Sequence, residues 1–219
     1  MISSWKGIRN RHKGETCLVI GNGPSLKDIP IDFLDYYPSF GTNRIYMLDG
    51  FTPTYYAAVN PLVIQQFSDD IRDMNCEKFI SAYYAAELVT DAHPLYSSVV
   101  PEFSRNPEAW IYEGYTVTFV CLQLAFYMGF STVLLVGVDH KYEFDGMPNE
   151  LKMVVGDDPN HFDRDYFGEG RLWHLPDLVQ SERAYKMAKN AYEMEGRKIV
   201  NLTPGSALDV FEKGDIAEW

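Results

Sequence analysis

Short apolar runs alternate with longer amphipathic stretches along most of the chain. The runs at 16–20, 132–139 and 198–202 carry few polar side chains, which is typical of parallel strands that are buried on both faces. Shorter runs of the same kind predict further strands, at residues 38–43, 54–60 and 78–82.

Two of the amphipathic stretches predict helices. Between residues 117 and 128, apolar side chains recur at intervals of three and four, and Gly129 follows as a stop. The stretch from Pro176 to Glu195 predicts a second helix, with Pro176 in its first turn and Gly196 after its end. Its predicted inner face is Ser181, Ala184, Tyr185, Ala188, Ala191 and Tyr192. Residues 64–74 have weaker helical character.

This alternation predicts an α/β fold with a doubly wound, mostly parallel, Rossmann-like sheet. We expect a short N-terminal arm at residues 1–14, followed by a single domain at residues 15–219. Residues 84–114 are irregular and rich in aromatic side chains, and are candidates for an interface between copies of the chain. Residues 140–175 are polar and too long for a simple connection, which predicts a mobile lid inserted in the domain. We refer to them as the lid segment.

Composition narrows the class of partner. The 219 residues carry a formal net charge of −12, so the broad basic face of a non-specific nucleic-acid binder is not expected. The short basic stretch at residues 6–13 is expected to be solvated. The three cysteines lack metal-ligand or redox spacing, and neither a signal peptide nor a membrane span is evident. A cytoplasmic protein is expected.

The first strand runs into a loop made of Gly21, Asn22, Gly23, Pro24 and Ser25. The glycines permit positive φ and close backbone approach, and Pro24 suits a first helical position. Because helix N-termini and loop amides bind anions, the loop predicts a phosphate cradle. It is neither a P-loop nor a dinucleotide fingerprint. The alternative is a plain turn between strand and helix.

Polar or small residues also follow the other predicted strands or open the helix at 117. Because ligands of such sheets bind beyond the carboxyl ends of the strands, we expect these residues to converge on one crevice and bind a nucleotide. They are Asn43, Asn60, Thr116, Thr118, Gly137, Asp139 and Tyr142, with His140 as a candidate proton carrier. Each has an ordinary alternative role in a turn, a helix cap or a polar loop.

The lid segment contains a cluster of acidic residues around His161. Asp157 and Asp158 are candidate ligands for Mg²⁺ or Mn²⁺, together with Asp163. His161 is instead a candidate general base, oriented by Asp163. A solvated acidic loop is the alternative.

Taken together, these motifs resemble a superfamily that contains the bacterial lipooligosaccharide sialyltransferases and the related MptE-like family, named for an archaeal hydroxymethylpterin diphosphokinase. The resemblance spans residues 15–212 and is carried by GNGPSL, Asn43, Asn60-Pro61, the Thr116 helix, GVD at 137–139 and the closing NLTPGSALDVF. It implies a sialyltransferase-like fold.

The resemblance also implies site residues. In the sialyltransferases, the positions that match Asn22, Gly23, Asn43, Asn60, Thr116, Gly137 and Asp139 surround a cytidine nucleotide. Their lid has a catalytic histidine after an aromatic-Ile-Gly triplet. Here the corresponding triplet, residues 166–168, is followed by Glu169, and His161 is the nearest substitute.

The sequence therefore predicts a nucleotide-binding transferase. The first hypothesis is a glycosyltransferase of surface-polysaccharide synthesis that uses a CMP-sugar, needs no cofactor and acts on a glycan or small-molecule acceptor. The second is a diphosphotransferase that uses ATP and Mg²⁺. The third is a nucleotide-binding protein without turnover.

Overall fold

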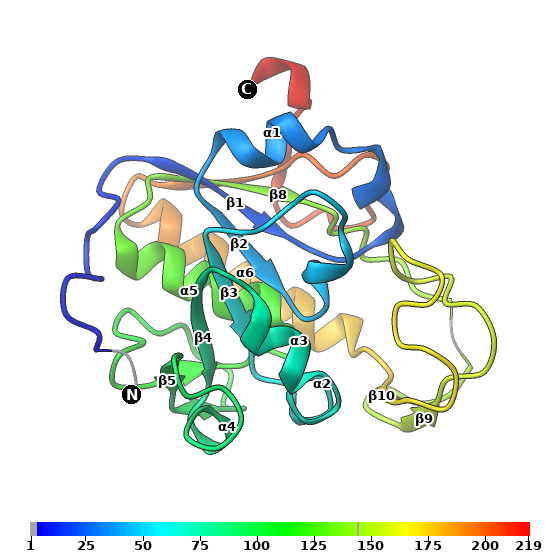
Figure 1. The fold of residues 1–219 in the computed structure, drawn as a ribbon. Coiled ribbons are helices and arrows are strands. Elements are labelled where there is room, and N and C mark those ends of the chain that lie inside the picture. Colours follow the sequence, from blue (N-terminus) through cyan, green and yellow to red (C-terminus); the bar gives the residue numbers. More distant parts are fainter. Residues whose placement is uncertain (1–3, 144) are drawn as a thin grey trace.

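The computed structural model describes residues 4–143 and 145–219. Its core is one eight-stranded sheet, and Figure 1 shows the central strands of this sheet with helices packed around them. All neighbouring strands of this sheet are parallel, in the order β12-β11-β8-β1-β2-β3-β4-β5. The strands are β1 (Thr16–Ile20), β2 (Ser39–Thr42), β3 (Tyr55–Ala58), β4 (Glu77–Ser81), β5 (His93–Leu95), β8 (Thr132–Val136), β11 (Lys198–Asn201) and β12 (Glu212–Lys213). The predicted α/β class and parallel sheet are confirmed.

Two small sheets and a set of helices complete the fold. Strands β6 (Ser97–Ser98) and β7 (Ile111–Tyr112) pair in the segment that was expected to be irregular, and β9 (Leu151–Met153) pairs with β10 (Leu172–His174) in the lid segment. The helices are η1 (Pro24–Asp28), α1 (Ile31–Tyr36), η2 (Ile45–Met47), α2 (Pro61–Gln66), α3 (Ser68–Asp73), α4 (Ala82–Ala85), α5 (Val117–Met128), α6 (Leu178–Glu193) and η3 (Ile216–Glu218). Within the described residues, no helix is long and apolar enough to cross a membrane.

The central strands are apolar on both faces because helices cover both. Val19 of β1 and Val133 of β8 belong to the core formed with α5 and α6. Their neighbours Leu18 and Leu134 belong to the core on the opposite face, which includes residues of α1 and α2. Successive side chains of each strand therefore pack into the two cores in turn. This explains why the central strands are unbroken apolar runs in the sequence.

Helix α5 is more deeply buried than its periodic pattern predicted. Every residue from Thr118 to Met128 is buried, although one apolar face was expected. The polar Gln123 is satisfied inside, since its amide group donates to the carbonyl of Tyr112 and accepts from the N–H of Ser104. Gly129 ends the helix with a φ of 91°, as predicted.

Two other helix predictions need correction. Helix α6 has the predicted inner face, but it begins at Leu178 because Asp177 caps it by accepting from the N–H of Gln180. Pro176 therefore precedes the helix. The stretch 64–74 forms two short helices, α2 and α3, which are separated at Phe67, whose φ of −133° is not helical.

The Lys and Arg side chains of the N-terminal arm are exposed, as expected, but other residues of the arm anchor it to the body of the protein. Ile8 is fully buried. The ring of His12 stacks on Phe130 with centroids 4.5 Å apart, and its Nε2 lies 2.6 Å from the hydroxyl of Tyr55. The arm is therefore solvated on its basic side and held in place by Ile8 and His12.

The lid segment is tied to the carboxyl ends of the central strands. Phe162 donates its N–H to the carbonyl of Asn22, and the buried Tyr166 hydroxyl accepts from the N–H of Arg44. Gln66 of α2 exchanges hydrogen bonds with the backbone of Leu172 in β10. These contacts place the lid segment beside the ends of β1 and β2.

The ends of β1 and β8 approach so closely that only glycine fits. A Cβ on Gly21 would overlap the carbonyl of Gly137, and a Cβ on Gly137 would lie 2.6 Å from the carbonyl oxygen of Gly21. Gly137 has a φ of 66°, but Gly21 and Gly23 do not adopt positive φ. The positive φ that glycine permits is therefore not used at Gly21 or Gly23, and close packing explains both glycines: a Cβ would overlap the Gly137 carbonyl at Gly21 and the Asp139 carboxylate at Gly23.

This contact predicts a specific cost of adding a methyl group at Gly137. Gly137→Ala is compared with Gly205→Ala, because Gly205 has a similar φ of 63° and open space around it. We expect Gly205→Ala to cost about 1–2 kcal/mol for the left-handed backbone, and Gly137→Ala to cost about 1–3 kcal/mol more from overpacking. Urea unfolding measures both, and equal losses of stability would contradict the steric explanation.

Candidate functional site

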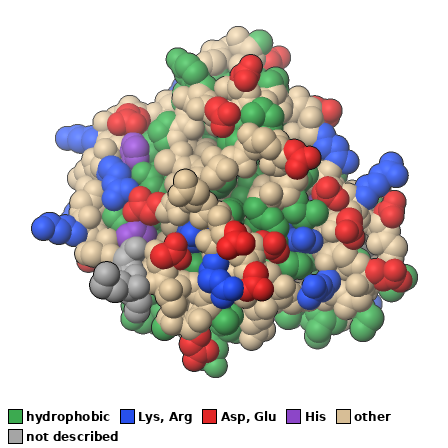
Figure 2. All heavy atoms as spheres, in the orientation of Figure 1, with side chains coloured by type: hydrophobic (Ala, Val, Ile, Leu, Met, Phe, Trp, Pro, Cys, Tyr) green, Lys and Arg blue, Asp and Glu red, His purple; other side chains and the backbone are tan. Residues whose placement is uncertain are grey.

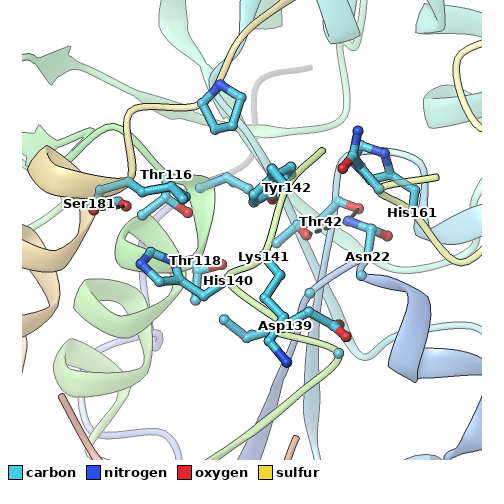
Figure 3. A pocket seen from close by; sticks show the side chains of 18 of the residues that line it. Asn22, Thr42, Thr116, Thr118, Asp139, His140, Lys141, Tyr142, His161 and Ser181 are labelled. Carbon is cyan, nitrogen blue, oxygen red and sulfur yellow. Dashed lines mark hydrogen bonds between the residues drawn. The ribbon is translucent and has the colours of Figure 1, made fainter. Parts of the chain in front are cut away.

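A pocket lies beyond the carboxyl ends of β1, β2 and β8, where an open α/β sheet binds its ligands (Figure 3). We call it the central pocket. Of the predicted site residues, it is lined by Gly21, Asn22, Gly23, Asn43, Thr116, Thr118, Gly137, Asp139, His140, Tyr142 and His161. Pro24, Ser25, Asn60, Asp157, Asp158 and Asp163 do not line it.

The glycine loop is not a free backbone cradle. The N–H of Gly21 donates to the carbonyl of Val136, and that of Gly23 donates to the carbonyl of Gly137. The N–H of Ser25 points to the carboxylate of Asp139 at 3.3 Å, and Pro24 has no N–H. The expected phosphate cradle is therefore wrong for these amides, because they hold the loop against the end of β8.

Asp139 is the anion that occupies the start of η1. Its Oδ2 accepts a hydrogen bond from the Ser25 hydroxyl at 2.7 Å, in addition to the contact with the Ser25 amide. A Cβ on Gly23 would overlap the same carboxylate. The carboxylate of Asp139 thus joins the end of β8 to the glycine loop, and its contact with a ribose or base stays a prediction for a residue that lines the central pocket.

Asn22 offers an unpaired acceptor to the central pocket. Its Nδ2 donates to both the carbonyl and the hydroxyl of Thr42, at 3.0 and 2.9 Å. This fixes the orientation of the amide, since the Thr42 carbonyl can only accept. The Oδ1 of Asn22 is buried and has no hydrogen-bond partner within the described part of the chain. An orphaned buried acceptor is costly unless a ligand or water supplies a donor.

Asn43, directly after β2, also has a buried side-chain oxygen to which no described residue donates a hydrogen bond. Asn60, in contrast, does not line the central pocket, although this was predicted. Asn43 has a φ of 48°, and its Oδ1 is also buried and unpartnered among the described residues. Asn60 caps α2 by accepting from the N–H of Leu62, and it lines a neighbouring pocket. The predicted convergence on one crevice therefore holds for Asn43, and Asn60 lies next to that crevice.

The opposite wall of the central pocket carries hydroxyl groups from α5 and α6. Thr116 stands at the N-cap position of α5, but its side chain makes no cap hydrogen bond, and its Oγ1 lies 3.4 Å from the hydroxyl of Tyr185. Figure 3 shows Thr116 and Ser181 on one side and Asn22 and His161 on the other. Burial raises the pKa of Tyr185 and of Tyr142, so both phenols remain protonated donors near neutral pH.

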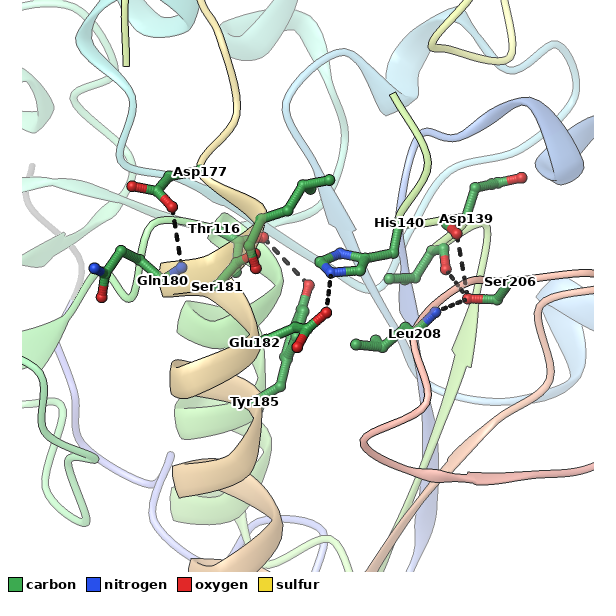
Figure 4. A network of polar contacts seen from close by, with 12 residues as sticks. Thr116, Asp139, His140, Asp177, Gln180, Ser181, Glu182, Tyr185, Ser206 and Leu208 are labelled. Carbon is green, nitrogen blue, oxygen red and sulfur yellow. Dashed lines mark hydrogen bonds and ion pairs between the residues drawn. The ribbon is translucent and has the colours of Figure 1, made fainter. Parts of the chain in front are cut away.

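His140 lies at the α6 side of the central pocket, with a strained φ of 54°. Its Nε2 is 3.4 Å from a Glu182 carboxylate oxygen, outside hydrogen-bond geometry (Figure 4). Its ring meets Tyr185 edge-on. Burial lowers the pKa of His140, and Glu182 opposes this shift.

His161 is held in one orientation by its surroundings. Its Nδ1 lies 2.8 Å from Oδ2 of Asp158, and both side chains are buried. Its ring stacks on Tyr166 with centroids 4.0 Å apart. The predicted partner Asp163 instead accepts from the N–H of Asp165. Asp158, three residues before His161, is therefore the orienting carboxylate.

The acidic residues of the lid segment have separate partners. Asp158 also accepts from the N–H of Asn160, and the exposed Asp157 lies 3.7 Å from Arg164. In residues 4–143 and 145–219, no group of three or more His, Cys, Asp or Glu side chains is placed to hold a metal ion. These aspartates thus do not form a ready-made magnesium site.

Sequence reasoning missed several residues that line the central pocket. They include Thr42, Tyr115, Lys141, Asn160, Ser181 and Tyr185. Ser181 and Tyr185 were assigned only to the inner face of α6, although that face continues past the core into the pocket. Lys141 follows His140 directly, and it is the only Lys or Arg that lines the described pocket.

A second cavity, which we call the side pocket, adjoins the central pocket. The two share Asn43, Tyr115, Thr116, Val117, Tyr142, His161 and Pro176. The side pocket extends toward α2 and the β9–β10 hairpin, where Trp173, His174 and Asn149 line it. His161 therefore lies at the junction of two cavities.

The face of the molecule in Figure 2 has carboxylates distributed among Lys and Arg side chains, with no broad basic surface on this side.

Comparison with known proteins identifies the family. The model of the 6-hydroxymethylpterin diphosphokinase MptE-like family matches residues 2–145. The chain belongs to this MptE-like family. The resemblance found in the sequence is thereby confirmed. No curated protein matches the chain.

Solved structures share the fold of this MptE-like protein at low sequence identity. The MAf glycosyltransferase of Magnetospirillum magneticum AMB-1 is similar with a TM-score of 0.63 and 14% identity, over 97% of this chain and 35% of that protein. The sialyltransferase CstII of Campylobacter jejuni, in complex with CMP-3FNeuAc, is similar with a TM-score of 0.52 and 16% identity, over 91% of this chain and 84% of that one. A complex of CstII with cytidine-5′-monophosphate gives 0.50 at 16% identity, over 92% and 85%. The chain thus spans about a third of the first of these proteins.

The burial of His140 predicts a pH-dependent stability. Because its pKa is lowered in the folded protein, the unfolded chain takes up this proton first as the pH falls below about 7. Stability should therefore decline across the interval between the unfolded and folded pKa values. His140→Gln should show a shallower decline than the wild type between pH 7 and pH 5 in urea unfolding. Parallel curves would contradict the shift.

Proposed function

We propose that this MptE-like protein is a glycosyltransferase that takes its sugar from a nucleotide of the CMP type. The observation that carries the proposal is the meeting, in one pocket, of an oriented histidine with buried amide oxygens that lack donors. His161 and Asn22 both line the central pocket. The fold is shared with a sialyltransferase whose solved complexes contain CMP and a CMP-sugar analogue.

The orphaned amide oxygens favour the nucleoside part of such a ligand. The Oδ1 atoms of Asn22 and Asn43 need donors, and a phosphate supplies none near neutral pH. Ribose hydroxyls and the exocyclic amine of cytosine do supply donors. The hydroxyl groups of Thr116 and Ser181 on the opposite wall can both donate and accept. We therefore assign the nucleoside to the space between these two walls.

The phosphate then needs a different partner from the amides of Gly21, Gly23 and Ser25, which are engaged. Lys141 is the cation of the central pocket, and its Nζ rests against the carbonyl of Gly205 at 2.7 Å. That contact to a neutral carbonyl is weaker than a charge-assisted bond to phosphate. We assign Lys141 to neutralise the charge that develops on the departing nucleotide.

His161 is assigned as the general base. Asp158 at Nδ1 favours the tautomer with its proton on that atom, and Nε2 is then a free acceptor. In the proposed step, Nε2 takes the proton of an acceptor hydroxyl while the oxygen bonds to the anomeric carbon of the donor sugar. The bond from that carbon to the phosphate oxygen breaks, and the nucleotide monophosphate leaves with the electron pair. Atoms and charge are balanced without another reactant.

The family description supports a second candidate, a diphosphotransferase of the hydroxymethylpterin type. In this second hypothesis the diphosphate comes from ATP with Mg²⁺. Mg²⁺ usually binds substrate phosphates with only one or two protein carboxylates, so a preformed cluster is not essential. The central pocket would then hold adenosine. The deciding difference is the nucleotide and its need for metal.

A thermal-shift panel distinguishes these candidates. CMP, CDP, UDP, GDP and ATP are tested with and without Mg²⁺, because binding to the folded state raises the unfolding midpoint. We expect CMP to raise it without added metal, and Asn22→Ala to lower the CMP affinity about tenfold or more through the lost contact. A Mg²⁺-dependent shift with ATP alone would favour the diphosphotransferase. No shift with any nucleotide would refute both.

The assignment of His161 as the base is tested by replacing His161 itself and, separately, each of its two neighbouring aspartates. His161→Ala should lower turnover of a CMP-sugar by roughly 10² to 10⁴ and leave CMP affinity nearly unchanged. Asp158→Asn should lower turnover by at least about tenfold through lost orientation of the ring, whereas Asp163→Asn should have little effect. Donor turnover, including slow hydrolysis, is followed by release of CMP. Loss with Asp163→Asn and not with Asp158→Asn would reverse the assignment.

A further inference from the structure

The two adjoining pockets differ in charge. The lining of the central pocket contains one cation, Lys141, and one carboxylate, Asp139. The side pocket contains two carboxylates, Glu113 and Asp177, and no Lys or Arg lines it in the part of the chain that the structure describes. The fixed charges of the central pocket therefore balance, whereas a ligand that reaches into the side pocket meets two carboxylates and no Lys or Arg among the described residues.

Neither carboxylate is neutralised by a cation. Glu113 accepts from the hydroxyl of Ser97 at 2.6 Å, and Asp177 accepts from the N–H of Gln180 and, at 3.3 Å, from the amide of Asn149. No ion pair to either carboxylate occurs among the described residues. Their charges therefore act on whatever occupies the side pocket, unscreened by a partner side chain.

The remaining lining suits a sugar. Amide groups of Asn60 and Asn149 alternate with apolar and aromatic side chains such as Val59, Phe167 and Trp173. Sugars present hydroxyl groups on their edges and C–H groups on their faces, so they need both kinds of surface. An acidic sugar would additionally place its charge near Glu113 or Asp177.

Tyr115 marks the junction of the two pockets. It lines both, it is 46% exposed, and its φ of 60° is rare for a bulky residue. The preceding Gly114 also has a positive φ, and a Cβ there would overlap Phe119. The packing of this turn thus forces Tyr115 into the open cleft, as strained residues at functional sites often are.

We propose that the side pocket is the acceptor subsite and that it takes neutral or amine-bearing sugars while excluding acidic ones. Tyr115 forms a face on which the acceptor ring packs. This rests on the proposed transferase function, because His161 at the junction is the base that would receive the acceptor proton. Glu113 and Asp177 set the charge preference.

The test is a glycan array probed with the full-length protein in saturating CMP at pH 8, where imidazole is ordinarily neutral. The array pairs neutral, amine-bearing and carboxylated glycans of matched backbone. We expect the neutral and amine-bearing members to bind at least about tenfold better than their carboxylated partners, as a few Å between like charges near a protein surface implies.

The double variant Glu113→Gln with Asp177→Asn keeps acceptor oxygens for Ser97 and Gln180 but removes both charges. In this double variant, the preference for neutral over carboxylated glycans should fall below about threefold. The control Asp32→Asn with Glu87→Gln changes the net charge equally at two exposed carboxylates that do not line the pockets, and it should leave the discrimination intact. Tyr115→Ala should lower all glycan signals about fivefold or more.

Equal binding of carboxylated and neutral partners by the wild type would overturn the charge preference. Absence of glycan binding by a protein whose midpoint still rises with CMP would overturn the subsite and leave the transferase proposal standing. Absence of the CMP shift would instead refute the transferase proposal, and the subsite with it. Unchanged discrimination in the double variant would show that Glu113 and Asp177 do not set it.

Discussion

The candidate site depends on the backbone contact between the ends of β1 and β8. Two hydrogen bonds, from Gly21 to Val136 and from Gly23 to Gly137, hold these ends together. The glycines let the two chains approach to a distance that a side chain would prevent. Asp139 extends the contact by anchoring Ser25 at the start of η1. The amides of Gly21, Gly23 and Ser25 are engaged in this framework, and we therefore assign the ligand contacts mainly to side chains that the framework positions.

Within short stretches of sequence, some residues hold the strand ends together and their neighbours face the ligand pocket. In the glycine loop, the backbone of Gly21 and Gly23 builds the framework, while the side chain of Asn22 faces the central pocket. After β8, Gly137 and Asp139 build the framework and also border the central pocket, and Lys141 and Tyr142 extend the lining. A motif of this kind carries two sets of constraints, one from packing and one from the ligand, and its residues should not be read as a single binding device.

The sequence sufficed for the parts of the fold that depend on local patterns. Strands β1 and β8 and helices α5 and α6 follow from apolar periodicity, and the parallel sheet follows from their alternation. Much of the pocket lining could also be predicted, because strand ends converge in such sheets. The roles of the individual lining residues could not be predicted, because they depend on partners that are distant in sequence. For example, Ser25 binds Asp139, and Gln66 binds the backbone of Leu172.

The histidine of the lid segment shows the same limit at short range. Asp158 and Asp163 are both close to His161 in sequence, and only the course of the backbone decides which carboxylate meets its ring. For helix α6, the periodic pattern predicted the face but not which part of that face lies in the core. Its inner face was predicted correctly, but the pattern could not distinguish Ala184, which is in the core, from Ser181, which borders the pocket.

Asn22 connects the lid segment to the pocket in a way that has a thermodynamic consequence. Its carbonyl receives the N–H of Phe162, while its side chain presents an unpaired oxygen to the central pocket. A ligand that binds this oxygen steadies the residue to which the lid segment is tied. Ligand affinity and the free energy of holding the lid segment in place are then linked, and by reciprocity each changes the other by the same amount.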